Sequence, residues 1–189
     1  MNGLGYMDRL IKDQQIGSGF SLIEMLVVIA VLSILLAVSL PNFQNMIERS
    51  GTNSQAKLFL TTLNLARSEA IKRGGNVAIC ASTDGADCSE KSWGAGWIVF
   101  FDANGDATGL AGSVDAGDTL IRVFDSGGAA NVTTLFNGDF FKYSALGFSA
   151  TNDSRTLLIC PASSSAANAR SIVIGSSGRG RRVETGLAC

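Results

Sequence analysis

The sequence predicts an α+β fold in which one long N-terminal helix packs against an antiparallel β-sheet. Three observations support this prediction: an apolar run near the N-terminus, an amphipathic helical pattern directly after it, and a series of short apolar segments in the rest of the chain. One helix followed by several strands, without alternation of the two, is typical of an α+β domain.

The apolar run extends from Phe20 to Leu40, and Glu24 is its one ionisable residue. At a rise of about 1.5 Å per residue, these 21 residues form a helix about 31 Å long, which matches the thickness of a bilayer core. A secretory signal peptide would have a shorter apolar core followed by an A-x-A-like cleavage site, and no such site follows here. We therefore expect a retained transmembrane helix over residues 20–41.

The helical pattern continues over residues 42–75 and becomes amphipathic. Gly74 and Gly75 provide the stop signal, and Gly51 with Thr52 and Asn53 predicts a bend or local loosening of the helix. Apolar residues recur at spacings of three and four, which places them on one face: Ala56, Phe59, Leu60, Leu63, Ala66 and Ala70. We expect this face to lie on a sheet.

Residues 76–189 have the texture of a β-rich globular domain. Without its first 40 residues, the chain of 189 retains about 149, enough for one domain with its own core. Clusters of Gly, Asn, Asp and Ser separate short apolar runs, which predict six to eight strands: NVAICAS, GWIVFFD, TLIRVFD, NVTTLF, FFKYSALGF, RTLLIC and RSIVIG.

The composition gives little support to an enzyme. The chain has no histidine, which removes the commonest general base and the commonest metal ligand. The net charge of −1 does not predict nucleic-acid or membrane-surface binding by the chain as a whole. We therefore expect no catalytic residues, no cofactor and no metal.

One segment has the beginning of a calcium-binding loop. Asp102, Asn104 and Asp106 place oxygen side chains at alternate positions, but the sixth and twelfth positions hold Ala107 and Ser113 in place of glycine and glutamate. A turn between strands, in which Asp, Asn and Gly bond the backbone, explains the segment better.

Four cysteines, Cys80, Cys88, Cys160 and Cys189, follow the apolar run. If the residues before the run are cytoplasmic, the cysteines lie on the oxidising side of the membrane, and their even number predicts two disulfides with three possible connectivities. We favour Cys80 with Cys88, across a short loop, and Cys160 with Cys189, which would tie the last residue to a strand. Four free thiols are the alternative.

The segment Gly19-Phe20-Ser21-Leu22-Ile23-Glu24 resembles the processing site of type IV prepilins and of type II secretion pseudopilins. This resemblance implies that prepilin peptidase removes residues 1–19 as a leader, that Phe20 becomes the methylated N-terminus, and that Glu24 pairs with the terminal amine of a neighbouring pilin subunit. It also implies a type IV pilin fold, an anchor in the inner membrane, and a globular domain in the periplasm or, within a filament, outside the cell.

A physical argument supports the assembly role of Glu24. A charged carboxylate inside an apolar helix costs at least about 2.5 kcal/mol, and pairing with an opposite charge reduces that cost. An unpaired Glu24 therefore favours docking beside a partner. The alternative is that Glu24 lies near the lipid headgroups and is tolerated there.

The leader departs from the resemblance, because leaders of this family are usually basic. Here two basic and two acidic residues balance, so the positive-inside signal for a cytoplasmic leader is weak: Arg9, Lys12, Asp8 and Asp13. Met1 and Met7 are both possible starts.

The C-terminal region carries a second candidate site. The segment from Arg170 to Cys189 contains one acidic residue, Glu184, and four arginines: Arg170, Arg179, Arg181 and Arg182. On an extended segment Arg179 and Arg181 would point to the same side, the planar guanidinium suits phosphate oxygens, and glycines let a phosphate approach closely. The alternative is an edge strand guarded by charge.

The GWIVFFDANGD segment, which follows a cysteine-bearing strand, resembles the GspH and FimT type of minor pilin or pseudopilin. FimT-type pilins of natural transformation have a DNA-binding Gly-Arg-x-Arg motif near the C-terminus, and residues 178–181 fit it. This resemblance implies that double-stranded DNA binds at Gly178, Arg179, Gly180, Arg181 and Arg182. The alternative function is that of a GspH-like pseudopilin with a structural role and no DNA binding.

Overall fold

The computed structural model describes residues 19–89, 93–105, 114–126, 132–136, 140–150, 154–183 and 189, with the side chains of residues 40, 41 and 132–136 left out. The predicted leader, apart from Gly19, lies outside the described residues, as does Asp106 of the calcium-loop candidate. The chain divides into two compact units, Met1–Pro41 and Asn42–Cys189, and each is considered by itself.

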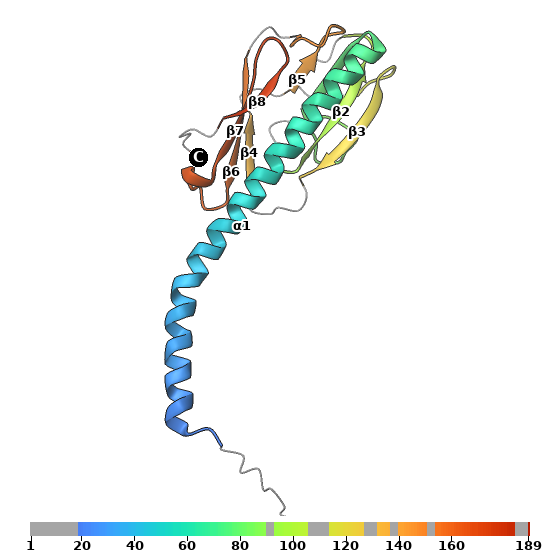
Figure 1. Cartoon of the computed structure of the whole chain (residues 1–189). Helices are drawn as coiled ribbons and strands as arrows, with labels where there is room; N and C mark the ends of the chain where they lie inside the picture. The colour runs from blue at the N-terminus through green and yellow to red at the C-terminus, as the bar shows by residue number, and fades with distance from the viewer. Residues whose placement is uncertain are drawn as a thin grey trace, which may run out of the picture. The chain divides into compact units, whose positions relative to one another are not determined.

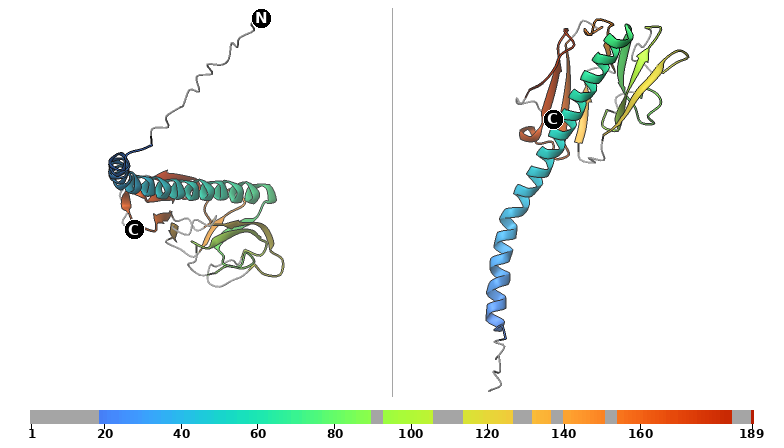
Figure 2. Two further views of the ribbon diagram at one scale, coloured as in Figure 1. Left: turned by 90° about the horizontal axis from the view of Figure 1, so that it is seen from below. Right: turned by 45° about the vertical axis from the view of Figure 1, so that its right-hand side comes forward.

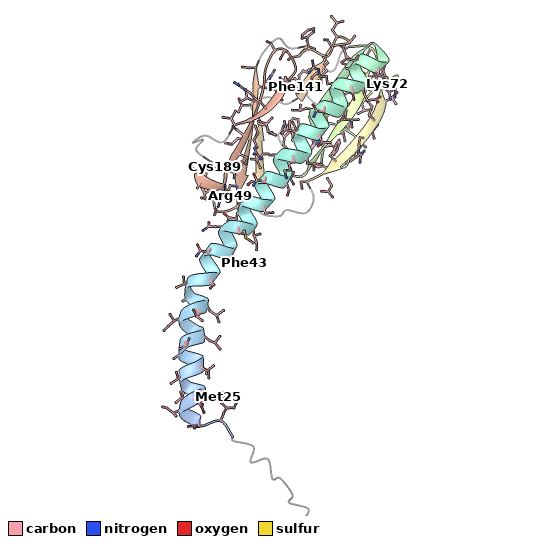
Figure 3. The ribbon with its side chains drawn as sticks, in the orientation of Figure 1. Met25, Phe43, Arg49, Lys72, Phe141 and Cys189 are labelled. Atoms are coloured by element: carbon pink, nitrogen blue, oxygen red, sulfur yellow. A yellow bond between two sulfur atoms is a disulfide. The ribbon has the colours of Figure 1, made fainter. Side chains whose placement is uncertain are left out.

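Helix α1 (Leu22–Arg73) is 52 residues long and contributes to both units. In the first unit its large apolar side chains, such as Met25, Ile29 and Leu36, are exposed. Figure 3 shows these side chains projecting from every side of the ribbon around Met25. This part of α1 is long and apolar enough to cross a membrane, by length and composition.

The remainder of α1 buries the face that the sequence predicts. Ala56, Phe59, Leu63, Ala66 and Ala70 are almost fully inaccessible to solvent, and Leu60 packs at the edge of the same core. The loosening expected at Gly51 is wrong, because the helix continues through this residue. Thr52, which follows Gly51, is buried, and its hydroxyl donates to the carbonyl of Glu48 at 3.2 Å. This bond within the helix satisfies the buried hydroxyl.

Two antiparallel four-stranded sheets follow the helix (Figure 1). The first has the order β3-β2-β1-β5 and the second β4-β6-β7-β8. The bounds are β1 (Asn76–Ala81), β2 (Gly96–Asp102), β3 (Thr119–Asp125), β4 (Val132–Phe136), β5 (Phe140–Tyr143), β6 (Arg155–Pro161), β7 (Arg170–Ile174) and β8 (Gly180–Val183), with a short 3₁₀ helix η1 (Ala166–Asn168) before β7.

Both sheets pack against the second part of α1, as the views in Figure 2 show. Phe59 of the helix contacts the rings of Trp93 and Trp97 edge-on, with centroid distances of 5.8 and 5.4 Å. Leu157 and Ile172 of the second sheet belong to the same core. One apolar helix face therefore joins the two sheets, and the predicted α+β fold is confirmed.

The structure contains two disulfide bonds, and their pairing is the one that the sequence analysis favours. Cys80 in β1 is bonded to Cys88 across the loop that follows, with a Cα–Cα distance of 5.5 Å. Cys160 in β6 is bonded to Cys189, with a Cα–Cα distance of 5.7 Å. The second bond ties the last residue of the chain to the second sheet.

The candidate calcium segment forms a turn at its described residues. Asp102 is buried, and its carboxylate accepts from the backbone N–H of Gly105 at 2.8 Å and from Nζ of Lys142 at 3.3 Å. The ammonium group of Lys142 thus supplies the positive charge that this carboxylate needs.

Replacing Thr62 tests the connection between α1 and β2. The indole Nε1 of Trp97 donates to Thr62 Oγ1 at 2.9 Å, and both residues are buried. We expect Thr62→Val to lower the free energy of unfolding by about 1–3 kcal/mol, because it leaves the indole N–H without an acceptor. Urea unfolding followed by tryptophan fluorescence measures this effect.

Thr61→Val is the matched control, since the hydroxyl of Thr61 is exposed and bonds only within the helix, to the carbonyl of Lys57. Equal stabilities of the two variants would contradict the assigned role of the Trp97 hydrogen bond.

Candidate functional site

The first candidate site is the N-terminal turn of α1. Ser21 precedes the helix, its Oγ accepts from the N–H of Ile23 at 3.3 Å, and its own N–H donates to Oε2 of Glu24 at 3.2 Å. The two side chains thus cap the helix reciprocally, in the manner of a capping box. A carboxylate in the first turn also interacts favourably with the helix dipole.

The cap leaves Glu24 able to accept more hydrogen bonds. An ionised carboxylate has about four lone-pair positions, and the backbone N–H of Ser21 occupies one of them. The predicted processing residues, Gly19 and Phe20, lie directly before the helix and are exposed; 78% of Phe20 is accessible. The structure thus places Gly19, Phe20 and Glu24 close together in the chain at the exposed N-terminal end of α1.

The second candidate site is the hairpin of β7 and β8 with its connecting turn, residues 170–183, here called the arginine hairpin. In its register Val173 lies opposite Arg181, and Ile172 lies opposite Arg182. Arg179 and Arg181 line one hollow of about 600 Å³ together with Ser154, Val173, Gly175 and Ser177. The expectation that these two arginines point to the same side is therefore confirmed.

Two other arginines of the region do not join this pair. Arg182 is exposed, but its side chain lies on the other face of β8 from that of Arg181. Its partner in the sheet register is the buried Ile172. Arg170 is buried: its Nε donates to Asn53 Oδ1 at 2.8 Å and its guanidinium also donates to the carbonyl of Ala169 at 2.6 Å. Counting Arg170 as part of a basic surface is wrong, because it connects the second sheet to α1.

The charges of Arg179 and Arg181 are available to a ligand. Both side chains are exposed, and within the described ranges no carboxylate forms a salt bridge with either. Charge-assisted bonds from guanidinium to phosphate are among the stronger hydrogen bonds that proteins form.

The two glycines of the motif have structural reasons that need no ligand. Gly178 has φ of 75°, and a Cβ there would lie 2.5 Å from the carbonyl oxygen of Gly147 and 2.7 Å from the ring of Tyr143. A Cβ at Gly180 would lie 2.6 Å from Leu63 of α1. Packing within the domain, rather than the approach of a phosphate, explains both residues.

Tyr143 holds the turn of the arginine hairpin in place. Its hydroxyl donates to the carbonyl oxygen of Gly178 at 2.8 Å, inside the protein. Burial raises the pKa of this phenol well above its usual value, so the hydroxyl stays protonated and remains a donor at neutral pH.

Sequence reasoning missed two contributors to these sites. The Ser-x-x-Glu spacing of Ser21 and Glu24 is a capping-box signature and was sufficient to identify the cap. The contact between Tyr143 and Gly178 has no such local signal, because it joins residues of different sheets.

Comparison with known families gives two matches. Residues 55–178 match the family described as type II transport protein GspH. Residues 18–40 match the prokaryotic N-terminal methylation motif. The second match includes Gly19, Phe20 and Glu24, whereas the first ends at Gly178, so that Arg179, Arg181 and Arg182 lie outside it.

Solved structures of a minor pilin and of a minor pseudopilin are similar to this chain. The type IV minor pilin FimU of Pseudomonas aeruginosa PAO1 is 25% identical, with a TM-score of 0.55 over 72% of this chain and 90% of FimU. A second crystal form of FimU gives 23% identity and a TM-score of 0.52, over 69% and 91% of the two chains. The minor pseudopilin EpsH from the type 2 secretion system of Vibrio cholerae is 14% identical, with a TM-score of 0.44 over 70% and 95%.

Alanine at two glycines tests the structure of the hairpin turn. We expect Gly178→Ala to lower the free energy of unfolding by about 1–3 kcal/mol, because it places a Cβ at positive φ and against the ring of Tyr143. Gly175→Ala is the matched control, since a Cβ there meets only Ser177 at an ordinary 3.9 Å. Thermal unfolding by circular dichroism measures both, and an unchanged stability of Gly178→Ala would contradict this packing.

Proposed function

This chain belongs to the family of type II transport protein GspH, and we propose that it is a minor pilin that captures DNA for natural transformation. The family and the fold establish the general class: a pilin-like or pseudopilin-like subunit of a type IV or type II filament system. The processing, assembly and DNA-binding steps that follow are the specific parts of the proposal.

The N-terminal residues support processing and assembly. In the proposed sequence of events, prepilin peptidase cuts between Gly19 and Phe20, removing residues 1–19, and the new terminus at Phe20 is methylated. The helix of residues 20–41 stays in the inner membrane. The rest of the chain lies in the periplasm or in an extracellular filament; it consists of the amphipathic part of the helix (42–75) and the β-rich domain (76–189). Exposure of Gly19 and Phe20, and the methylation-motif match that covers them, support this proposal.

Glu24 would then pair with the terminal amine of a neighbouring subunit. The apolar surroundings make an uncompensated carboxylate unfavourable, and the capping bond from Ser21 satisfies only part of its capacity to accept. An ammonium group from another chain supplies the missing opposite charge, so that docking and charge neutralisation occur together.

The arginine hairpin supports the DNA-binding part of the proposal. The observation that carries it is the pair of exposed arginines, Arg179 and Arg181, which line one hollow without a described carboxylate partner. Double-stranded DNA offers phosphates at regular spacing, and contacts of this kind are independent of sequence and sensitive to salt. Arg182, on the other face of β8, would contact a neighbouring phosphate only if the DNA passes over the edge of the sheet.

A pseudopilin of the type II secretion system is the second candidate function. The family description and the position of β8 at the edge of its sheet favour it, because charged side chains on an edge strand prevent unwanted strand pairing. In that case the arginines protect the edge and bind no DNA.

Replacing Glu24 tests the assembly role. We expect Glu24→Gln to abolish incorporation into filaments, because the amide still accepts from the Ser21 N–H but carries no charge for the neighbouring amine. The amount of the protein in sheared and pelleted filaments measures this, with Ser21→Ala as the control that alters the cap and retains the carboxylate. Normal incorporation of Glu24→Gln would contradict the assembly role of the charge.

Replacing two arginines tests DNA binding. We expect Arg179→Ala with Arg181→Ala to weaken binding of duplex DNA by the full chain in detergent micelles, and to reduce the slope of log affinity against log salt by about one per arginine. Gel shifts over a range of salt concentrations measure both effects.

Arg49→Ala with Arg122→Ala is the matched control, because it removes two exposed charges outside the hairpin. If the wild-type chain binds no duplex, or if both double variants bind it as the wild type does, the secretion alternative replaces the DNA proposal.

A further inference from the structure

The turn after β5 lies against the turn of the arginine hairpin (Figure 1). This segment, Ser144–Ser149, is here called the β5 turn. The N–H of Ser149 donates to the carbonyl of Ser176 at 3.0 Å, and the carbonyl oxygen of Gly147 fills the space beside Gly178. Two segments that are far apart in the sequence thus form one continuous surface.

The β5 turn exposes two large apolar side chains. Leu146 is 75% exposed and Phe148 is 50% exposed. The backbone closes the turn by itself, because Gly147 N–H donates to Ser144 O at 2.8 Å and Ser144 N–H donates to Phe148 O at 2.9 Å. Surface turns are normally built from Gly, Asn, Asp, Ser and Pro, so an exposed Phe and Leu at this position have no evident role in forming the turn.

Three arginines lie in the segments next to the β5 turn. Arg179 and Arg181 follow the adjoining hairpin turn, and Arg67 of α1 lies below Gly147, where a Cβ would come within 3.1 Å of the Arg67 Nε. No carboxylate of the described segments forms a salt bridge with any of these three arginines. Exposed aromatic rings and guanidinium groups on one surface are the combination that binds single-stranded nucleic acid, by base stacking together with phosphate contacts.

We propose that the β5 turn completes a site for unpaired nucleotides, in which Phe148 stacks on an exposed base while Arg179 and Arg181 bind the adjacent phosphates. This inference rests on the proposed DNA binding and specifies its substrate as single-stranded DNA or the unpaired end of a duplex. Within an intact duplex, neighbouring bases cover both faces of every base, so Phe148 has no face on which to stack. A protein partner would use the apolar side chains, whereas a nucleic-acid strand would use both the aromatic ring and the guanidinium groups of the neighbouring segments.

The test compares two probes on the full chain in detergent micelles: a single-stranded oligonucleotide and a relaxed, covalently closed duplex circle. Phe148→Leu retains apolar surface and removes the aromatic face. We expect it to lower affinity for the single strand about tenfold, and affinity for the closed circle less than twofold. Phe148→Trp should restore single-strand binding, which separates stacking from an effect on folding.

Leu120→Ala is the matched control, because Leu120 is 41% exposed on β3, in the other part of the domain, and its loss should affect neither probe. Equal affinity of the wild type and Phe148→Leu for the single strand would overturn the stacking site, as would an equal loss for both probes. If Phe148→Leu instead removed a co-purifying filament subunit without a change in DNA affinity, the surface would be a protein contact and the inference wrong. Failure of the wild-type chain to bind the closed duplex circle would overturn the proposed function itself.

Discussion

The first part of α1 must be covered by something other than its own chain. Its large apolar side chains, from Phe20 to Val38, are exposed on every side of the helix. At roughly 25 cal/mol per Å², leaving such a surface in water is strongly unfavourable. Lipid or the helices of other subunits can cover it. Membrane anchoring and assembly into a bundle of helices are thus two solutions to one constraint. In the proposed assembly, the carboxylate of Glu24 would decide how a subunit moves from the first environment to the second, since it favours a neighbour that brings a positive charge.

The second part of α1 faces the opposite situation, because its apolar face is already covered by the same chain. Phe59, Leu63 and Ala66 lie in a core to which both sheets contribute, and the hydrogen bond from Trp97 to Thr62 fixes the helix against β2. Buried Arg170, bonded to Asn53, connects the second sheet to the helix near the start of this region. One continuous helix therefore serves two purposes: it presents apolar surface to other molecules in one half and organises a self-contained domain in the other.

The sequence was sufficient to predict the features that depend on local pattern. The apolar run, the buried face from Ala56 to Ala70 and the strands all follow from periodicity and composition, and the disulfides follow from the position of cysteines beside strands. The split of the strands into two sheets was not predictable, because strand order is set by contacts between distant segments. The burial of Arg170 and the packing of Gly180 against α1 were not predictable for the same reason. Arg170 contacts Asn53 of α1 and Gly180 packs against Leu63 of α1, and neither contact has a signal in the local sequence.

The account of this chain as a processed filament subunit is tested most directly by the intact mass of the protein isolated from the membranes of its own cells. We expect a chain that begins at Phe20, carries one additional methyl group at its terminus and contains both disulfides. A mass that includes the residues before Phe20, with an unmodified terminus, would contradict the account, because no free amine would then be available to neutralise the acid of the adjoining subunit.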